Sequence, residues 1–154
     1  MARIIETIDI DVPVDVAYNQ WTQLERFPDI LPAIERVEQL DDTHVRWTVR
    51  LGPETRTFDT EVTEQLPDER IAWTSTRGEV DHAGVVTFHR LDEAQTRVTV
   101  QIDWDPETFG EKAAALIDLP DRAVQLSLRS FKDYLEARGV PDGGWRGSVN
   151  RPAP

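Results

Sequence analysis

The sequence predicts an α+β domain in which an antiparallel sheet of about seven strands is followed by one long C-terminal helix. Up to residue 105, short runs of alternating apolar and polar residues are separated by turn-forming residues, which is typical of a meander of strands. After Pro120 the apolar residues change to helical spacing. An antiparallel meander of this kind has one wet face and one dry face.

The chain begins with a strand that leads into a helix. Apolar residues from Ile4 to Val12 follow a period close to two, and this predicts a first strand that ends at Pro13. Residues 14–24 then carry apolar side chains at helical spacing, and a proline at position 13 is suited to the entry of a helix.

Two prolines bend the chain after this helix. The residue before a proline is disfavoured in the helical region, so Phe27 before Pro28 should break the helix. Residues 28–31 predict a second short turn of helix, which Pro32 ends. We therefore expect two short helices after the first strand.

Five runs between residues 44 and 104 have the alternation of half-buried strands. In "HVRWTVRL" the apolar residues share one face and the polar residues the other. The later runs repeat this spacing between turns that contain Gly, Pro or Asp. Counting along the runs places these apolar residues on the inner face: Trp47, Phe58, Trp73, Val86, Phe88, Val100 and Trp104.

The last predicted element is an amphipathic helix. Its apolar residues from Val124 to Leu135 follow the i, i+4, i+7, i+11 rule, and Gly139 is well placed to end it. A further short helix is expected before it, over residues 111–117.

We assign residues 1–139 to one domain and residues 140–154 to a flexible C-terminal tail. The tail is rich in Gly and Pro, which disfavours a packed core. It contains one large aromatic residue, Trp145, which is either exposed or docked on the domain.

Composition excludes several classes of protein. The chain has no Cys, which excludes disulfides and thiolate chemistry. Its formal net charge of −12 repels phosphate backbones and anionic headgroups, so we expect no nucleic-acid partner. No apolar run approaches the ~20 residues of a membrane-spanning helix, and the N-terminus carries acids where a signal peptide would be apolar. We expect a cytoplasmic monomer or weak dimer without stable membrane insertion.

Three segments can be compared with a known fold. These are "VPVDVAYNQWTQLERFPDILPAIERVEQLDD", "AGVVTFHRLDEAQTRVTVQIDWDP" and "SLRSFKDYLEARG". They resemble the opening, the closing hairpin and the end of the gripping helix in the helix-grip fold of the START/Bet v 1-like (SRPBCC) superfamily. The resemblance covers residues 3–139. It is greatest to bacterial polyketide cyclase/dehydrase-like proteins and coenzyme Q-binding START proteins, and it indicates the fold better than the chemistry.

The resemblance implies a curved sheet that encloses an apolar cavity against the helix. The two bent helices would plug one end with Tyr18, Trp21 and Phe27. A single helix covers too little of a wide sheet to fill the space, and small-molecule sites are mostly apolar clefts. The alternative is that the same side chains form an ordinary core. The predicted ligand contacts are Trp47, Phe58, Trp73, Val86, Phe88, Val100 and Trp104 from the sheet, and Leu128 and Phe131 from the helix.

Three functions are compatible with this fold. The first is binding or transport of a hydrophobic small molecule such as a lipid, an isoprenoid quinone or an aromatic polyketide. The second, implied by the resemblance, is a polyketide cyclase, aromatase or dehydratase that uses general acid–base chemistry. Counting along the strands gives His82, Glu64 and Arg90 as its candidate residues, unless these only lie at the rim. The third is an interaction module built around Trp145.

We expect no metal and no cofactor. His82 and His89 are separated by an odd number of residues, which sends their side chains to opposite faces of a strand. The sequence has no glycine-rich phosphate motif and no Gly-x-Ser-x-Gly motif. The loops over residues 77–84 and 105–112 are the expected lids of the cavity.

Overall fold

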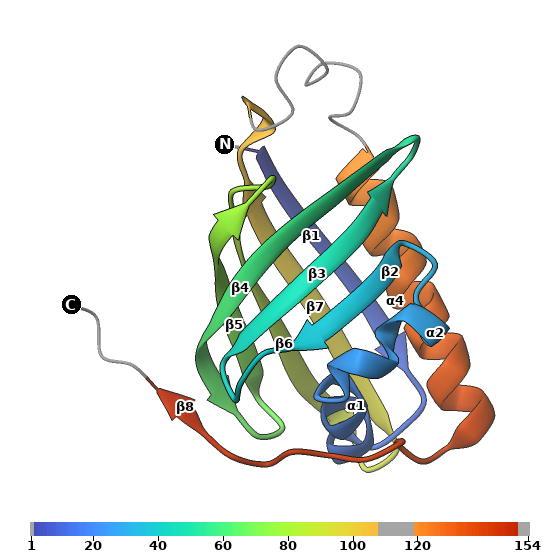
Figure 1. The fold of residues 1–154 in the computed structure, drawn as a ribbon. Coiled ribbons are helices and arrows are strands. Elements are labelled where there is room, and N and C mark those ends of the chain that lie inside the picture. The colour runs from blue at the N-terminus through green and yellow to red at the C-terminus, as the bar shows by residue number, and fades with distance from the viewer. Residues whose placement is uncertain (1, 108–118, 151–154) are drawn as a thin grey trace.

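The computed structural model of the protein describes residues 2–107 and 119–150, and a curved antiparallel sheet wraps around one long helix (Figure 1). The strand order is β1-β7-β6-β5-β4-β3-β2. This is the helix-grip fold, and the predicted sheet, long helix and two short helices are confirmed. The elements are β1 (Ala2–Ile10), α1 (Val14–Trp21), η1 (Leu24–Arg26), α2 (Phe27–Ile30), β2 (Ile34–Gln39), β3 (His44–Leu51), β4 (Glu54–Leu66), β5 (Arg70–Gly78), β6 (His82–Asp92), β7 (Gln95–Trp104), α4 (Leu119–Arg138) and β8 (Val149–Asn150).

The prediction that Phe27 leaves the helical region before Pro28 is wrong. Phe27 has φ −55° and ψ −39° and is the first residue of α2, so Pro28 lies in the first turn. A proline is tolerated there because its missing N–H would have no acceptor within the helix. The expected behaviour does occur at the other end of α2, where Leu31 before Pro32 has an extended backbone.

Strand β4 does not keep a strict alternation. Val62 pairs with Trp73 of β5, but Glu64 already pairs with the next residue, Ala72, so Thr63 is an extra residue on β4. Beyond this bulge Gln65 is the buried residue. The prediction that Glu64 follows Val62 on the inner face is therefore wrong, because a one-residue slip exchanges the two faces of a strand.

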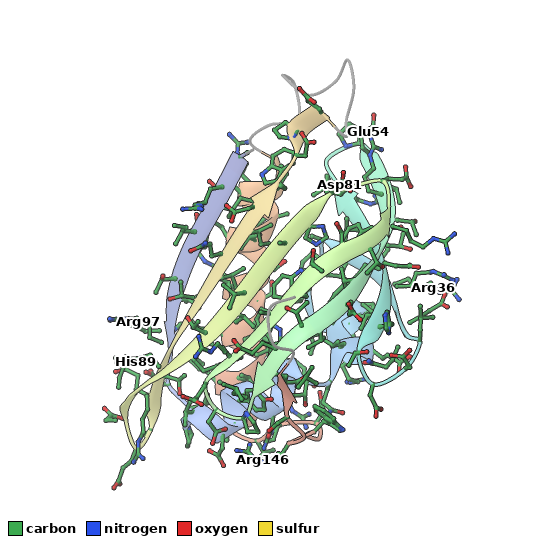
Figure 2. The ribbon with its side chains drawn as sticks, turned by 90° about the vertical axis from the view of Figure 1, so that its left-hand side faces the viewer. Arg36, Glu54, Asp81, His89, Arg97 and Arg146 are labelled. Carbon is green, nitrogen blue, oxygen red and sulfur yellow. The ribbon has the colours of Figure 1, made fainter. Side chains whose placement is uncertain are left out.

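The outer face of the sheet is covered by charged side chains. Arg97 binds Asp9 at 2.8 Å, and Arg46 binds Asp59 at 2.9 Å. Arg97 and His89 lie opposite each other on β7 and β6 and point away from the sheet in Figure 2. Exposed ion pairs such as that of Arg97 with Asp9 contribute little to stability, so the fold depends on what lies under the inner face.

Aromatic side chains pack tightly under α1 and α2, which cover one end of the space between the sheet and α4 (Figure 1). The ring of Trp21 lies edge to face with those of Phe27, at 5.5 Å, and Phe131, at 5.2 Å. Tyr18 packs in the same way on Phe88, at 5.4 Å. Tyr18, Trp21 and Phe27 thus join the short helices to the sheet and to α4.

The chain continues past α4 as an ordered segment along the sheet's lower end (Figure 1). Gly139 ends α4 with φ 75°, and its N–H donates to the carbonyl of Leu135 at 2.7 Å. Val149 pairs with Gln65 as part of β8, which adds to β4. Residues 140–150 of the predicted flexible tail therefore have defined contacts with the domain.

In the described ranges, no helix has both the length and the apolar composition needed to cross a bilayer. The expected helix over residues 111–117 and the greater part of the expected lid over residues 105–112 lie outside the described residues.

Candidate functional site

A cavity of about 520 Å³ lies between the inner face of the sheet and α4. Its volume falls within the range of roughly 300–1,000 Å³ that is usual for small-molecule sites. The chain has five tryptophans, and every one of them lines this cavity. They come from elements far apart in the sequence: Trp21, Trp47, Trp73, Trp104 and Trp145.

The structure brings six of the nine predicted ligand contacts to the cavity wall. The other three, Val86, Phe88 and Phe131, are buried in the packed core beside it and do not line it. Val86 and Phe88 do face inward as the alternation predicts, but side chains of α1 such as Trp21 pack on Phe88 and Phe131. The six that line the cavity are Trp47, Phe58, Trp73, Val100, Trp104 and Leu128.

Two of the indole rings are held in place by their strand neighbours. Trp47 donates its Nε1–H to Oγ1 of Thr60 at 2.9 Å, across the β3–β4 pair. Trp73 lies directly over Gly84, its partner on β6. A Cβ atom at position 84 would come within 2.3 Å of Cζ2 of Trp73, so only glycine allows the ring to lie this close to the backbone.

Sequence reasoning did not assign a further set of lining residues to the ligand. Those on the strands lie in step with the predicted contacts, as Ile71 does with Trp73, whereas those from α2, β2 and the loops were not indicated by any alternation. The additional apolar lining residues are Leu24, Phe27, Leu31, Ala33, Ile34, Val45, Val49, Leu51, Val62, Ile71, Val80, Ile102, Ala123 and Val124.

His82 is the candidate acid–base residue that the structure places in the cavity. It is 8% exposed, and its ring lies edge to face with Phe58 at 4.7 Å. Its Nδ1 lies 3.1 Å from the carbonyl oxygen of Val80. A carbonyl oxygen only accepts, so Nδ1 carries the proton and Nε2 of the neutral ring is an acceptor. Burial lowers the pKa of His82, which keeps the imidazole neutral at neutral pH.

The other two acid–base candidates do not join His82. Glu64 forms an ion pair with Arg70 at 3.1 Å and does not line the cavity. Arg90 is exposed and belongs to a separate surface depression beside Asp15. The three candidates therefore do not form one catalytic group.

One end of the cavity opens to solvent between η1, the β2–β3 turn and the C-terminal segment. Its lining includes the exposed residues Glu25, Asp42 and Trp145. Among the described lining residues, Arg26 is the only Arg or Lys, and it binds Asp29 at 3.0 Å and the tail. The deeper wall is thus apolar, with Thr60, Gln65, His82 and Ser127 as its polar residues.

The arrangement suits an uncharged ligand better than an anion. A buried charge needs a partner, and the described lining has no free cation deep in the cavity to supply one. Across residues 2–107 and 119–150, no group of three or more His, Asp or Glu side chains is placed to hold a metal ion.

Comparisons with known proteins agree with this geometry. The model of the family "Polyketide cyclase / dehydrase and lipid transport" matches residues 10–131. An uncharacterized 17.2 kDa protein from the melC2-rnhH intergenic region of Streptomyces lincolnensis is 46% identical over 97% of this chain and 99% of its own length.

Solved structures share the fold at low sequence identity. The Zhui aromatase/cyclase from Streptomyces sp. R1128 superposes with a TM-score of 0.79 at 19% identity, over 94% of this chain and 99% of that protein. A START superfamily protein from Mycobacterium smegmatis gives a TM-score of 0.70 at 15% identity, over 86% and 98%. Because the family model spans most of the chain, the protein belongs to the polyketide cyclase/dehydrase and lipid transport family.

Proposed function

We propose that the protein binds or transports an uncharged hydrophobic small molecule. A ligand with a flat conjugated system, such as an isoprenoid quinone or an aromatic polyketide, fits best, and a lipid is the other candidate. The protein would act as a cytoplasmic monomer or weak dimer. The observation that carries the proposal is the cavity of about 520 Å³ with all five tryptophans in its wall. Indole rings offer large flat faces for stacking on conjugated rings.

The size of the cavity is sufficient for measurable affinity. A ligand that buries roughly 300 Å² of apolar surface gains about 7.5 kcal/mol at roughly 25 cal/mol per Å². Association entropy takes back about 4 kcal/mol or more of this gain, so we expect millimolar affinity from burial alone, to which stacking on the indole rings adds. Polar groups such as the Thr60 hydroxyl and the Nε2 of His82 then fix the orientation of the ligand.

The direct test is extraction of the purified protein under denaturing conditions, followed by mass spectrometry. It is combined with titration of Nile red, a short-chain ubiquinone and a hydroxylated anthraquinone. We expect a bound lipophile or saturable 1:1 binding of at least one probe. Absence of both would overturn the proposal.

Two tryptophan substitutions on α4 locate the binding. Ser127 lines the cavity, whereas its neighbour Leu126 is 59% exposed on the outside of the same helix. Ser127→Trp should fill the cavity and weaken probe binding at least tenfold, and Leu126→Trp should leave binding unchanged. Equal effects of the two substitutions would place the binding elsewhere.

The position of His82 supports a second candidate function, cyclisation of a poly-β-ketone. In this reaction Nε2 of His82 accepts the proton from a carbon between two ketones. The electron pair left on that carbon attacks a second ketone carbon of the same chain and forms the ring bond, and the ketone oxygen takes up the proton. Loss of the resulting hydroxyl as water, with a proton from the neighbouring carbon, gives the double bond.

The cyclase function is tested with His82→Gln on a poly-β-ketone substrate. We expect ring formation to fall at least a hundredfold, as is typical when a general base is removed. His89→Gln is the matched control, because His89 is exposed on the outer face of the same strand. Full activity of His82→Gln would remove His82 from the mechanism.

A further inference from the structure

We propose that residues 140–150, here named the C-terminal strap, form a gate of the ligand site, and that Trp145 on the strap closes the mouth of the cavity over the ligand. This inference rests on the proposed binding function. The strap passes beside α1 at the lower end of the sheet and ends as β8 on β4 (Figure 1). The exposed lining residues of the cavity lie beside it.

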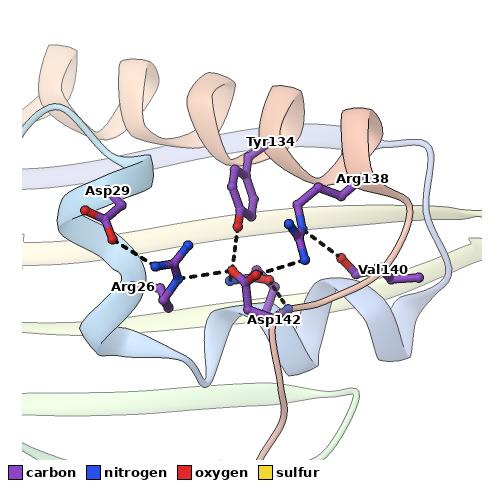
Figure 3. A network of polar contacts seen from close by, with 7 residues as sticks. Arg26, Asp29, Tyr134, Arg138, Val140 and Asp142 are labelled. Carbon is purple, nitrogen blue, oxygen red and sulfur yellow. Dashed lines mark hydrogen bonds and ion pairs between the residues drawn. The ribbon is translucent and has the colours of Figure 1, made fainter.

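Asp142 fastens the first part of the strap to α4 and to the short helices (Figure 3). Its Oδ2 accepts from the hydroxyl of Tyr134 at 2.6 Å, from Nε2 of Gln20 at 3.1 Å and from Nε of Arg26 at 3.4 Å. Its Oδ1 binds Nη2 of Arg138 at 2.9 Å. Its backbone N–H donates to Oε1 of Gln20 at 2.8 Å. We name this group of contacts the Asp142 latch.

The next residues of the strap lie flat on the end of α1. A Cβ atom would come within 2.8 Å of Oε1 of Gln23 at position 143, and within 2.9 Å of Cγ of Asn19 at position 144. Both positions are glycine, so the strap backbone packs directly on the side chains of Gln23 and Asn19. This close fit brings the following residue, Trp145, to the mouth.

Trp145 and the preceding Gly144 are the residues of the strap that line the cavity. The backbone N–H of Trp145 donates to Oγ1 of Thr22 at 3.0 Å, and its side chain joins the lining beside η1. The residue is nevertheless 37% exposed, so the indole lies between ligand space and solvent. The indole packs closely against the backbone of Gly147 and therefore moves together with the strap.

A second fastening follows Trp145. Arg146 donates from Nη1 to Oδ1 of Asn19 and from Nη2 to Oδ2 of Asp68, both at 2.7 Å. Val149 then pairs with Gln65, a residue whose side chain lines the cavity. The mouth residue is thus held between two polar fastenings, and local opening of the strap requires both of them to break.

The gate is tested first without a ligand, by amide hydrogen exchange. In Asp142→Asn the carboxylate that binds Arg26 and Arg138 becomes a neutral amide of the same shape. We expect the backbone N–H groups at position 142 and of Trp145 to exchange about tenfold faster in this variant. The backbone N–H groups of β6 and β7 should keep their exchange rates. Asp133→Asn, which removes an exposed charge from α4, is the matched control. Unchanged exchange in the strap of Asp142→Asn would overturn the latch and with it the gate.

The second arm measures the kinetics of Nile red by stopped flow. Trp145→Ala should raise the dissociation rate at least fivefold. Val140→Ala, at an apolar position of the strap that is 56% exposed and does not line the cavity, should not change it. Asp142→Asn should raise the association and dissociation rates together, because it eases opening of the strap without altering the cavity wall.

If Nile red binds but all these rates stay at the wild-type value, the gate is wrong while the binding function stands. If nothing binds while the strap amides still respond to Asp142→Asn, the binding function fails and the latch stands without a ligand to enclose.

Discussion

Two regions under the inner face of the sheet differ in what fills them. Under β6 and β7, near α1 and the second half of α4, aromatic rings such as Tyr18 and Phe88 contact one another and leave a solid core. Under β3, β4 and β5, near the first half of α4, Trp47 and Trp73 border open space. The alternation of apolar residues is the same in both regions, so inward direction and tight packing are separate properties of a strand residue.

The difference has a structural cause. The solid region receives side chains from α1, which packs on β6 and β7, and from the second half of α4, whereas α2 packs on β2 and α4. The hollow region is bordered by the first half of α4 and, toward its mouth, by η1 and α2. Its indoles Trp47 and Trp73 are held against their own strands by Thr60 and Gly84. A wall that is fixed to the sheet does not collapse into the space beside it.

The largest expected effect comes from truncating one aromatic residue in each region. Phe131→Ala should lower the free energy of unfolding by about 3–5 kcal/mol, because it opens a void in a packed core. Trp73→Ala should cost less than about 2 kcal/mol, because one side of its ring already faces the cavity and has fewer contacts to lose. Urea denaturation measures both values. Equal losses would show that the two regions are packed alike.

Overpacking is the converse experiment and has an intermediate effect. Val98→Phe forces a larger side chain into the solid region and should cost about 1–3 kcal/mol. Val62→Phe directs the same added volume toward the cavity and should cost less than about 1 kcal/mol. Only Val62→Phe should reduce Nile red binding. A similar stability loss in both variants would contradict the presence of free volume beside Val62.

A smaller effect is expected from the hydrogen bond that positions Trp47. Thr60→Val removes the acceptor of the indole N–H and should cost about 1 kcal/mol, the usual net value of a hydrogen bond. Thr48→Val on the outer side of the neighbouring pair is the control and should stay within about 0.5 kcal/mol. Thermal denaturation and the tryptophan emission maximum together report stability and ring environment. An unchanged emission spectrum in Thr60→Val would mean that this bond does not hold the ring.

The smallest effect is a change in pH dependence. Burial lowers the pKa of His82 in the folded protein, so the unfolded chain takes up a proton first as the pH falls. The contribution of His82 to stability is therefore complete above about pH 6.5, the ordinary histidine pKa, and declines as the pH falls through the folded value. His82→Gln should reduce the slope of Tm against pH between pH 7 and 5.

The exposed His89 provides the control for this experiment, since His89→Gln should leave the slope unchanged. The same slope in all three proteins would show that His82 is not buried as a neutral ring.

Local patterns predict the fold well and the site less completely. The alternation in β3 and the helical spacing from Val124 to Leu135 identify the sheet and the gripping helix. The rule for residues before proline holds at Leu31 and fails at Phe27, because it does not say whether the proline begins a new helix. These patterns involve residues that are close together in the sequence. Secondary structure depends largely on such local residues, so the patterns predict it well.

The remaining features depend on contacts between distant residues. The bulge at Thr63 arises from the pairing of β4 with β5, and nothing in the sequence of β4 itself indicates it. The Gly- and Pro-rich sequence of the strap is typical of a flexible tail. The contact that holds the strap in place joins Asp142 to Gln20, 122 positions away, so no local pattern indicates it. Val86 lies in the packed core, whereas Val100 lies in the cavity wall. This difference depends on which helix covers each residue.

The bulge at Thr63 decides which polar side chain of β4 reaches the cavity. It turns Glu64 to the outside and the neutral amide of Gln65 to the inside. If an added residue of β5 paired with Thr63, the regular alternation would continue and bring Glu64 to the inside in place of Gln65. A one-residue insertion in the neighbouring strand would thus replace a neutral group of the wall with a carboxylate, without any substitution.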